Sequence, residues 1–226
     1  MQHAYLLLED GTRLRGTAFG AVHETDGEVV FNTGMVGYPE TMTDPSYQGQ
    51  ILVCTYPLIG NYGVPGRERE NTLLKNFESE AIHVQALIVT EYSKKHSHWA
   101  AEQSLHDWMA EEKIPGIQGI DTRALTKKIR EEGSMLGRIV YEEDAPWTPV
   151  NDPNKRDLAG EVTVPEPVLY EKGPKKIAVV DAGTKNNILQ AFLRRDITVL
   201  RLPYDHDPLK EDVDGIVFSN GPGDPK

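Results

Sequence analysis

A proline-rich stretch divides the chain into two parts with different patterns. Six of its 15 prolines lie within residues 145–174, at positions 146, 149, 153, 165, 167 and 174. Proline lacks a backbone donor and resists both helices and strand ladders, so we predict an extended linker over 145–174. The apolar residues within it favour a linker that is at least partly ordered. The alternative is a long ordered crossover packed on one domain.

Residues 1–144 contain several strand-like runs separated by Gly, Pro, Asp and Asn. Runs rich in β-branched and aromatic residues between such breakers are typical of strands. We therefore predict an α+β domain with mostly antiparallel pairing. The runs are AYLLLED (4–10), EVVFNTG (28–34), ILVCTYP (51–57), VQALIVTEY (84–92) and MLGRIVY (135–141).

Two helices interrupt these strands. The first is predicted to follow Ser97 as its cap, since the residues after it place apolar side chains on one helical face. The second is predicted to begin after Asp121 and to end at Gly133. The apolar face of the first helix consists of Ala101, Leu105, Trp108 and Met109.

After residue 176 the pattern changes to nearly continuous apolar strands that alternate with a helix. The strands are expected at 177–182, 197–203 and 215–220, and the helix at 184–196. Such alternation predicts a parallel sheet covered on both faces and joined by right-handed crossovers. Residues 175–226 thus read as the start of an α/β domain.

Two polar loops follow strands of this predicted sheet, at 181–185 and 220–224. Ligands of open parallel sheets bind beyond the carboxyl ends of the strands. Gly221 and Gly223 lack a Cβ, so a ligand could approach their backbone closely, and Pro222 stiffens the turn between them. A tight turn without a ligand is an equally good interpretation of the spacing alone.

Charge and composition exclude some classes of function. The formal net charge is −11, which would repel a phosphate backbone, so we expect no nucleic acid partner. No apolar run reaches the length of a membrane span and no signal peptide is recognisable, so we expect no membrane association. The single cysteine, Cys54, fits a reducing compartment, and we expect a cytoplasmic protein.

Longer motifs carry a resemblance to a known family. The stretch IVFSNGPGDP resembles the oxyanion-strand motif of class I glutamine amidotransferases, and the whole chain is similar to the small-subunit family of carbamoyl phosphate synthetases. Residues 175–226 would then be the first, incomplete part of an amidotransferase domain. The other matching stretches are LEDGTRLRGTAFG (8–20), GEVVFNTGMVGYPETMTDPSYQGQI (27–51), TYPLIGNYG (55–63), GIDTRALTKKIREEGSM (119–135) and VVDAGTKNNI (179–188).

This resemblance implies a function and a partner. Small subunits of the family hydrolyse glutamine, and the ammonia passes to a large synthetase subunit that makes carbamoyl phosphate for pyrimidine and arginine biosynthesis. ATP and magnesium are expected on that large subunit. The chain has no G-x-x-x-x-G-K-[ST] loop, so we expect no cofactor in it.

The family's site residues fall on three positions. By resemblance, the hydroxyl of Ser46 hydrogen-bonds glutamine across the domain interface, and the main chain of Gly221 and Gly223 contacts the same ligand. Gly221 would also offer its amide to the developing oxyanion. From the residues alone, Ser46 reads as an ordinary turn residue after Asp44-Pro45.

No catalytic residue is expected in this chain. The family's nucleophilic cysteine lies downstream of GPGDP, and its histidine and glutamate lie later still. Cys54 lies in an apolar strand without a glycine elbow and is expected to be buried and inert. We therefore expect no glutamine hydrolysis by these 226 residues. A non-catalytic module that docks on the synthetase is the alternative to a glutaminase, and a free-standing nucleotide-binding protein is a third, weaker hypothesis.

Other polar residues have less specific interpretations. His96, His98 and His106 lack the spacing of a metal site, so no metal is expected. Lys185 would either face the path of substrate or ammonia or be an exposed lysine at a helix start. A partial sheet also exposes apolar strand faces, so residues beyond about 176 are expected to be less stable than 1–144.

Overall fold

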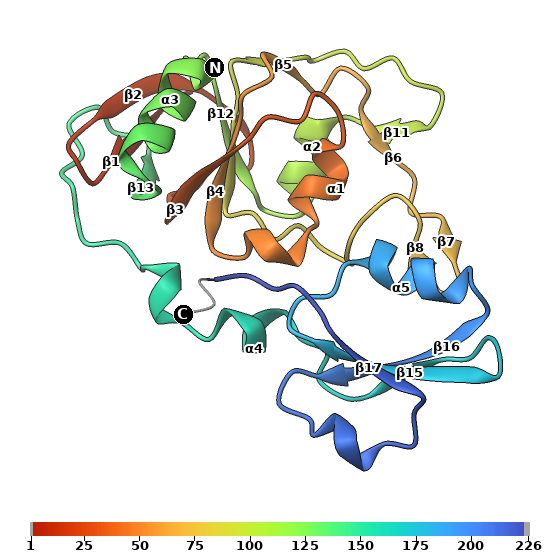
Figure 1. The fold of residues 1–226 in the computed structure, drawn as a ribbon. Helices are drawn as coiled ribbons and strands as arrows, with labels where there is room; N and C mark the ends of the chain where they lie inside the picture. Colours follow the sequence, from red (N-terminus) through yellow and green to blue (C-terminus); the bar gives the residue numbers. More distant parts are fainter. Residues whose placement is uncertain (1, 224–226) are drawn as a thin grey trace.

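The computed structural model describes residues 2–223. Figure 1 shows a barrel region that carries most of the strands and a smaller sheet region below it. The barrel is closed, with the strand order β1-β13-β3-β4-β9-β12-β2. Its strands are β1 (His3–Leu8), β2 (Arg13–Gly20), β3 (Thr25–Asn32), β4 (Gln50–Cys54), β9 (Ala86–Ile88), β12 (Pro115–Gln118) and β13 (Met135–Val140).

Barrel closure combines two kinds of pairing. Strand β1 pairs antiparallel with β13 and with β2, whereas β3, β4, β9 and β12 pair parallel to one another in that order. All the strands contribute apolar residues to one interior cluster, which includes Leu6, Val29 and Ile51. Side chains in strands alternate between faces, so Leu52 and Cys54 point to a second cluster outside the barrel.

Helices and short strand pairs surround the barrel. The short pairs are β5 (Leu58–Ile59) with β10 (Glu91–Tyr92), β6 (Val64–Pro65) with β11 (Ala101–Gln103), and β7 (Arg69–Glu70) with β8 (Leu73–Leu74). The helices are α1 (Tyr38–Met42), the 3-10 turn η1 (Pro45–Tyr47), α2 (Leu105–Glu111) and α3 (Thr122–Glu132).

The first predicted helix begins later than expected. Residues 101–103 form β11, and the helix cap is Ser104 rather than Ser97. The Ser104 hydroxyl accepts the amide of Asp107 at 3.0 Å, a bond that Ser97 is too far upstream to make. The second helix follows the prediction: the Asp121 carboxylate accepts the amide of Ala124 at 2.9 Å, and Gly133 is the C-cap.

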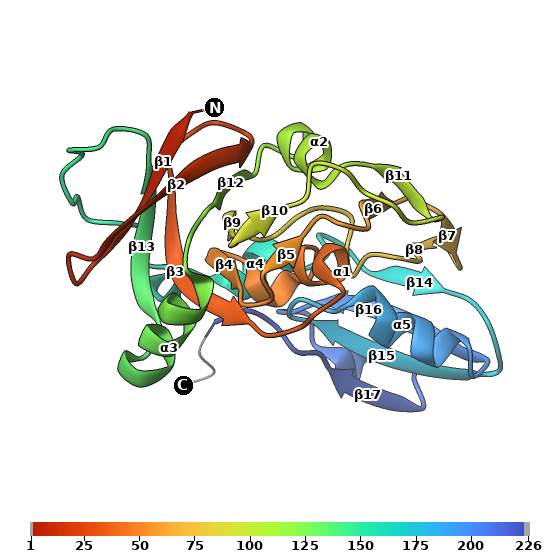
Figure 2. The same ribbon diagram turned by 90° about the horizontal axis from the view of Figure 1, so that it is seen from above.

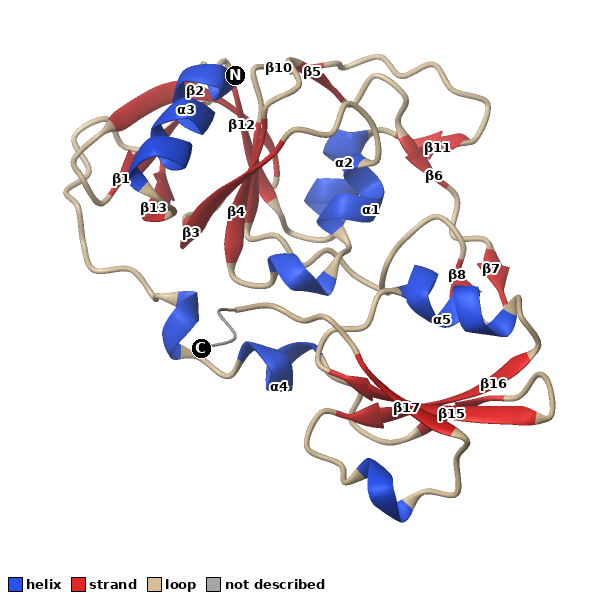
Figure 3. Ribbon diagram, in the orientation of Figure 1, coloured by secondary structure: helices blue, strands red, loops and turns tan. Residues whose placement is uncertain are grey.

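The sheet region has the strand order β14-β16-β15-β17. Strand β15 pairs parallel with β16 and β17, as predicted, while β14 adds an antiparallel edge that the sequence did not suggest. Helix α5 covers one face of the sheet (Figures 2 and 3). The elements are β14 (Val168–Tyr170), β15 (Lys175–Asp181), α5 (Asn186–Leu193), β16 (Ile197–Pro203), the turn η3 (Pro208–Lys210) and β17 (Gly215–Phe218).

The proline-rich segment contains short ordered elements. These are the turn η2 (Pro153–Lys155) and α4 (Leu158–Val162), which precede β14. Ala145 packs with Tyr5 and Leu7 of β1, and the side chain of Leu158 is buried. The segment therefore contacts the barrel region at its start and pairs with the sheet region at its end.

A hairpin of the barrel region enters the core of the sheet region. Leu73 of β8 is buried in one cluster with Val179, Leu189, Leu193 and Val199. These four partners belong to β15, α5 and β16. Because apolar burial is the dominant favourable term in packing, this hairpin joins the two regions into one packed unit.

Candidate functional site

The loop that carries Ser46 has a buried acidic residue at its base. Asp44 is the N-cap of η1, and its Oδ1 accepts the amide of Ser46 at 2.9 Å. This bond and Pro45 at the first position of the turn fix the backbone. The Ser46 hydroxyl therefore projects from a rigid turn rather than from a mobile loop.

The loop after β17 reaches this hydroxyl. Asn220 donates from Nδ2 to the Ser46 Oγ at 2.7 Å, although 174 positions separate the two residues. Ser219 holds the loop in place, since its hydroxyl accepts the amide of Ala182 at 3.0 Å and donates to the carbonyl of Asn220 at 2.7 Å. The two predicted site segments, far apart in sequence, thus lie side by side.

Both predicted glycines have a steric requirement in this loop. A Cβ on Gly221 would collide with the carbonyl oxygen of Ala182, and Gly223 has a φ of +89° that favours glycine. Among the described residues, the amide of Gly221 donates no hydrogen bond. The remainder of the motif, 224–226, lies outside the described residues.

A fully buried carboxylate shapes the neighbouring turn at the end of β15. Asp181 accepts the amide of Thr184 at 2.7 Å and that of Gly183 at 3.1 Å. Its other oxygen accepts the amide of Val164 at 2.9 Å and pairs with Arg201 at 2.8 Å. A buried carboxylate with this many partners is fully satisfied, so Asp181 is a support for the turn rather than a free acid.

Lys185 connects the two regions through its side chain. It is the N-cap residue of α5, and its Nζ lies 2.5 Å from Oδ2 of Asp44. The Asp44 side chain is only 8% exposed, which makes this ion pair less screened than the surface pairs of the chain. Neither of the two sequence interpretations of Lys185 anticipated Asp44 as its partner.

Cys54 is buried, as predicted, and it lies outside this site. It belongs to the apolar cluster around α1 and α2. Burial raises the pKa of the Cys54 thiol to about 12, so almost no thiolate forms near neutral pH. A protonated thiol is a weak nucleophile, and the burial of Cys54 agrees with the sequence interpretation.

The histidines have local roles. The Nδ1 of His106 accepts the amide of Gly20 at 2.8 Å, and the Nδ1 of His98 accepts that of Ala100 at 3.2 Å. Between residues 2 and 223, His, Cys, Asp and Glu side chains form no group of three that could hold a metal ion.

A separate cavity of about 590 Å³ lies beside α1. Trp99 on its rim is 93% exposed. It shares no lining residue with the Ser46 and Gly221 loops, so it is distinct from the site described above. Its lining also includes Glu40, Tyr62, Lys75, His98 and Glu102. In the part of the chain that the structure describes, no helix is long and apolar enough to cross a membrane.

The sheet, with its glycine loop beyond the carboxyl ends of parallel strands, corresponds to a known class of domain. Residues 178–226 match the family model of glutamine amidotransferase class-I. Residues 6–139 match that of the carbamoyl-phosphate synthase small chain, CPSase domain. The chain belongs to the carbamoyl-phosphate synthase small-chain family, as the sequence motifs indicated.

Curated relatives cover nearly all of this chain. The multifunctional protein CAD of Squalus acanthias is 50% identical over 226 residues, which cover 99% of this chain and 10% of the relative. The multifunctional protein ura1 of Schizosaccharomyces pombe is 47% identical, with 97% and 11% covered. The mitochondrial carbamoyl-phosphate synthase [ammonia] of Homo sapiens is 47% identical, with 99% and 15% covered. The chain thus spans between 10% and 15% of the length of these three relatives.

Proposed function

We propose that this chain forms the glutamine-binding side of a carbamoyl phosphate synthase. The hydroxyl of Ser46 and the main chain of Gly221 and Gly223 would bind glutamine between the barrel and sheet regions. The observation that carries the proposal is the 2.7 Å bond from Asn220 to Ser46, since it joins the Ser46 turn to the loop of Gly221 and Gly223. Membership of the small-chain family supports the same assignment.

The site offers the donors that binding and acyl transfer require. Among the described residues the Gly221 amide donates no hydrogen bond, and we propose that it donates to a ligand oxygen. One fixed donor to an oxyanion stabilises a transition state by about 3 kcal/mol. The Ser46 hydroxyl can exchange its bond from Asn220 for one with a ligand, because a hydroxyl both donates and accepts.

Hydrolysis requires a nucleophile that these residues do not supply. Cys54 is the single cysteine and is protonated and buried, and loss of a nucleophile costs on the order of 10⁶-fold in rate. We infer that the 226 residues bind glutamine without hydrolysing it. Where glutamine is hydrolysed in this family, the ammonia would be delivered to a synthetase partner, on which ATP and magnesium act to make carbamoyl phosphate for pyrimidine and arginine biosynthesis. By themselves, the 226 residues would act as a docking module for that partner.

Calorimetric titration with L-glutamine tests the binding site. The wild-type chain is expected to bind L-glutamine but not D-glutamine, and S46A is expected to bind about five- to tenfold more weakly, the value of one hydrogen bond. S134A, which alters an exposed serine bonded to Glu28, is the matched control and should leave binding unchanged. Equal affinity of S46A and the wild type would refute the site.

Light scattering with a synthetase large subunit tests the partner. A stoichiometric complex that forms without release of glutamate is the expected result. Glutamate release above background by the chain alone would refute the inference that these residues bind glutamine without hydrolysing it. A folded chain that forms no complex would refute the docking role.

A further inference from the structure

Helix α5 begins without a cap from its own sequence. The amides of a first helical turn lack partners within the helix and need acceptors from elsewhere. The N-cap residue, Lys185, makes no side-chain cap bond, because an ammonium group has no acceptor for a backbone amide. Its Nζ is paired with Asp44 instead. The Lys185 carbonyl accepts the amide of Ile188 at 3.0 Å, but the amides of Asn186 and Asn187 take their acceptors from outside the helix.

Glu78 of the barrel region provides them. Its carbonyl accepts the amide of Asn186 at 2.8 Å, and its Oε2 accepts the amide of Asn187 at 3.0 Å. Its Oε1 also accepts Nδ2 of Asn187 at 3.2 Å. A carboxylate at a helix N-terminus interacts favourably with the helix dipole as well. Glu78 thus caps α5 from a segment 108 positions earlier in the chain, counted from 78 to 186.

Glu78 is also bonded to the segment that carries Ser46. Its amide donates to Thr43 Oγ1 at 3.0 Å, and the adjacent Ser79 hydroxyl donates to the Thr43 carbonyl at 2.6 Å. Thr43 is buried and directly precedes Asp44. These contacts leave little freedom between Glu78 and the turn that presents Ser46.

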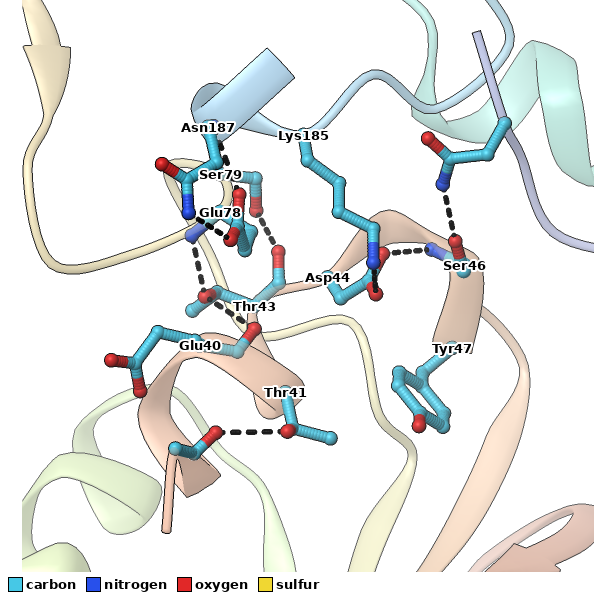
Figure 4. Close-up of polar contacts among 12 residues, drawn as sticks. Glu40, Thr41, Thr43, Asp44, Ser46, Tyr47, Glu78, Ser79, Lys185 and Asn187 are labelled. Carbon is cyan, nitrogen blue, oxygen red and sulfur yellow. Dashed lines mark hydrogen bonds and ion pairs between the residues drawn. The ribbon is translucent and has the colours of Figure 1, made fainter. Parts of the chain in front are cut away.

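Together the contacts form a closed ring across the interface, which Figure 4 shows. It runs from Thr43 through Glu78 to the start of α5, and returns through Lys185 to Asp44. Both halves of the Ser46 and Gly221 site are attached to this ring: Ser46 through Asp44, and the Gly221 loop through the turn between β15 and α5. A displacement of Glu78 would therefore move both the Ser46 turn and the Gly221 loop.

We propose that Glu78 is a positioning residue of the glutamine site. By capping α5 from the barrel region, it sets the distance between the Ser46 turn and the Gly221 loop. The inference rests on the function proposed above. Glu78 touches no part of the site itself. It acts through Thr43 and the first turn of α5.

The test compares glutamine affinity in matched variants by calorimetry. E78A is expected to weaken L-glutamine binding about tenfold, as expected for loss of a helix cap. E78Q keeps an acceptor for Asn187 and should bind within about twofold of the wild type. E80A removes the neighbouring carboxylate, which pairs with Arg69 at the surface, and should leave binding unchanged. Circular dichroism confirms that each variant is folded at the temperature of titration.

A double-mutant cycle separates positioning from general stability. If Glu78 positions Ser46, the loss caused by S46A should be smaller in the E78A background than in the wild type. Additive losses, or E78A binding as tightly as the wild type, would overturn the inference while leaving the proposed function intact. A wild-type chain that binds no L-glutamine would instead refute the proposed function and this inference with it. Hydrogen exchange at the amide of Asn187 should be faster in E78A, and unchanged exchange would show that Glu78 is not the cap.

Discussion

At the scale of single residues, ion pairs fix where segments meet. The pKa of Asp10 falls from 3.8 to about 2, chiefly because of the hydrogen bond from Lys128, which lies 2.5 Å away, and also because of the Thr12 amide. Lys128 belongs to α3, whereas Asp10 lies in the turn between β1 and β2. This pair therefore attaches the helix to the barrel.

The lowered pKa predicts a pH dependence of stability. A depressed carboxyl pKa stabilises the folded state above the unfolded value, and this contribution is lost as pH falls from about 3.8 to about 2. D10N should therefore be less stable at neutral pH by up to about 1 kcal/mol, because the side chains are partly exposed and the pair is screened. Urea unfolding at pH 7 and at pH 2 measures the difference, which should be much smaller at pH 2. A difference that is the same at both pH values would contradict the assignment.

Sequence motifs could identify some site residues but not their supports. Ser46, Gly221 and Gly223 stand in motifs that resemble a family. Asp44 lies in one of these motifs and Glu78 in none. Neither could be identified as a support, because each acts on a partner more than a hundred positions away. The buried state of Cys54 was predictable because an apolar run surrounds it in the sequence.

At the scale of elements, the hairpin of β7 and β8 inserts Leu73 into the apolar core of the sheet region. L73A should create a cavity between this hairpin, α5 and the sheet, and should lower the free energy of unfolding by about 2–5 kcal/mol. L209A is the matched control, since Leu209 is 82% exposed and its truncation should cost less than about 0.5 kcal/mol. Urea denaturation of both variants provides the comparison. Equal stability of L73A and L209A would show that the hairpin does not contribute to the core.

Element prediction succeeded where the local pattern was complete. The strand at 197–203 was predicted with its observed bounds, because its near-continuous apolar run is bounded by Asp196 and Tyr204. Strand β2, RLRGTAFG, was missed because arginines and glycines interrupt its apolar residues. Its stability comes from pairing with β1 and β12, which no local pattern reveals. Closure of the barrel was unpredictable for the same reason.

At the scale of the whole molecule, the barrel region covers α5 of the sheet region but leaves part of β17 exposed to solvent. The barrel hairpin packs on α5, whereas Phe218 on β17 is 74% exposed. Amide hydrogen exchange should therefore be faster in β17 than in β4, whose residues 51–54 are all buried. Exchange in α5 should be closer to that of the barrel. Equal protection of β17 and β4 would contradict this expectation.

The pairing of β1 with β13 has a consequence for synthesis of the chain. Tyr5 lies opposite Val140, so the barrel cannot close until nearly all of its residues have left the ribosome. At a synthesis rate of about 5–20 residues per second, β13 is completed roughly 7–27 seconds after β1. Throughout that interval the apolar segment HAYLLL is available to molecular chaperones or to neighbouring nascent chains. Translation speed between residues 8 and 135 therefore sets how long the first strand of the barrel remains open to misassembly.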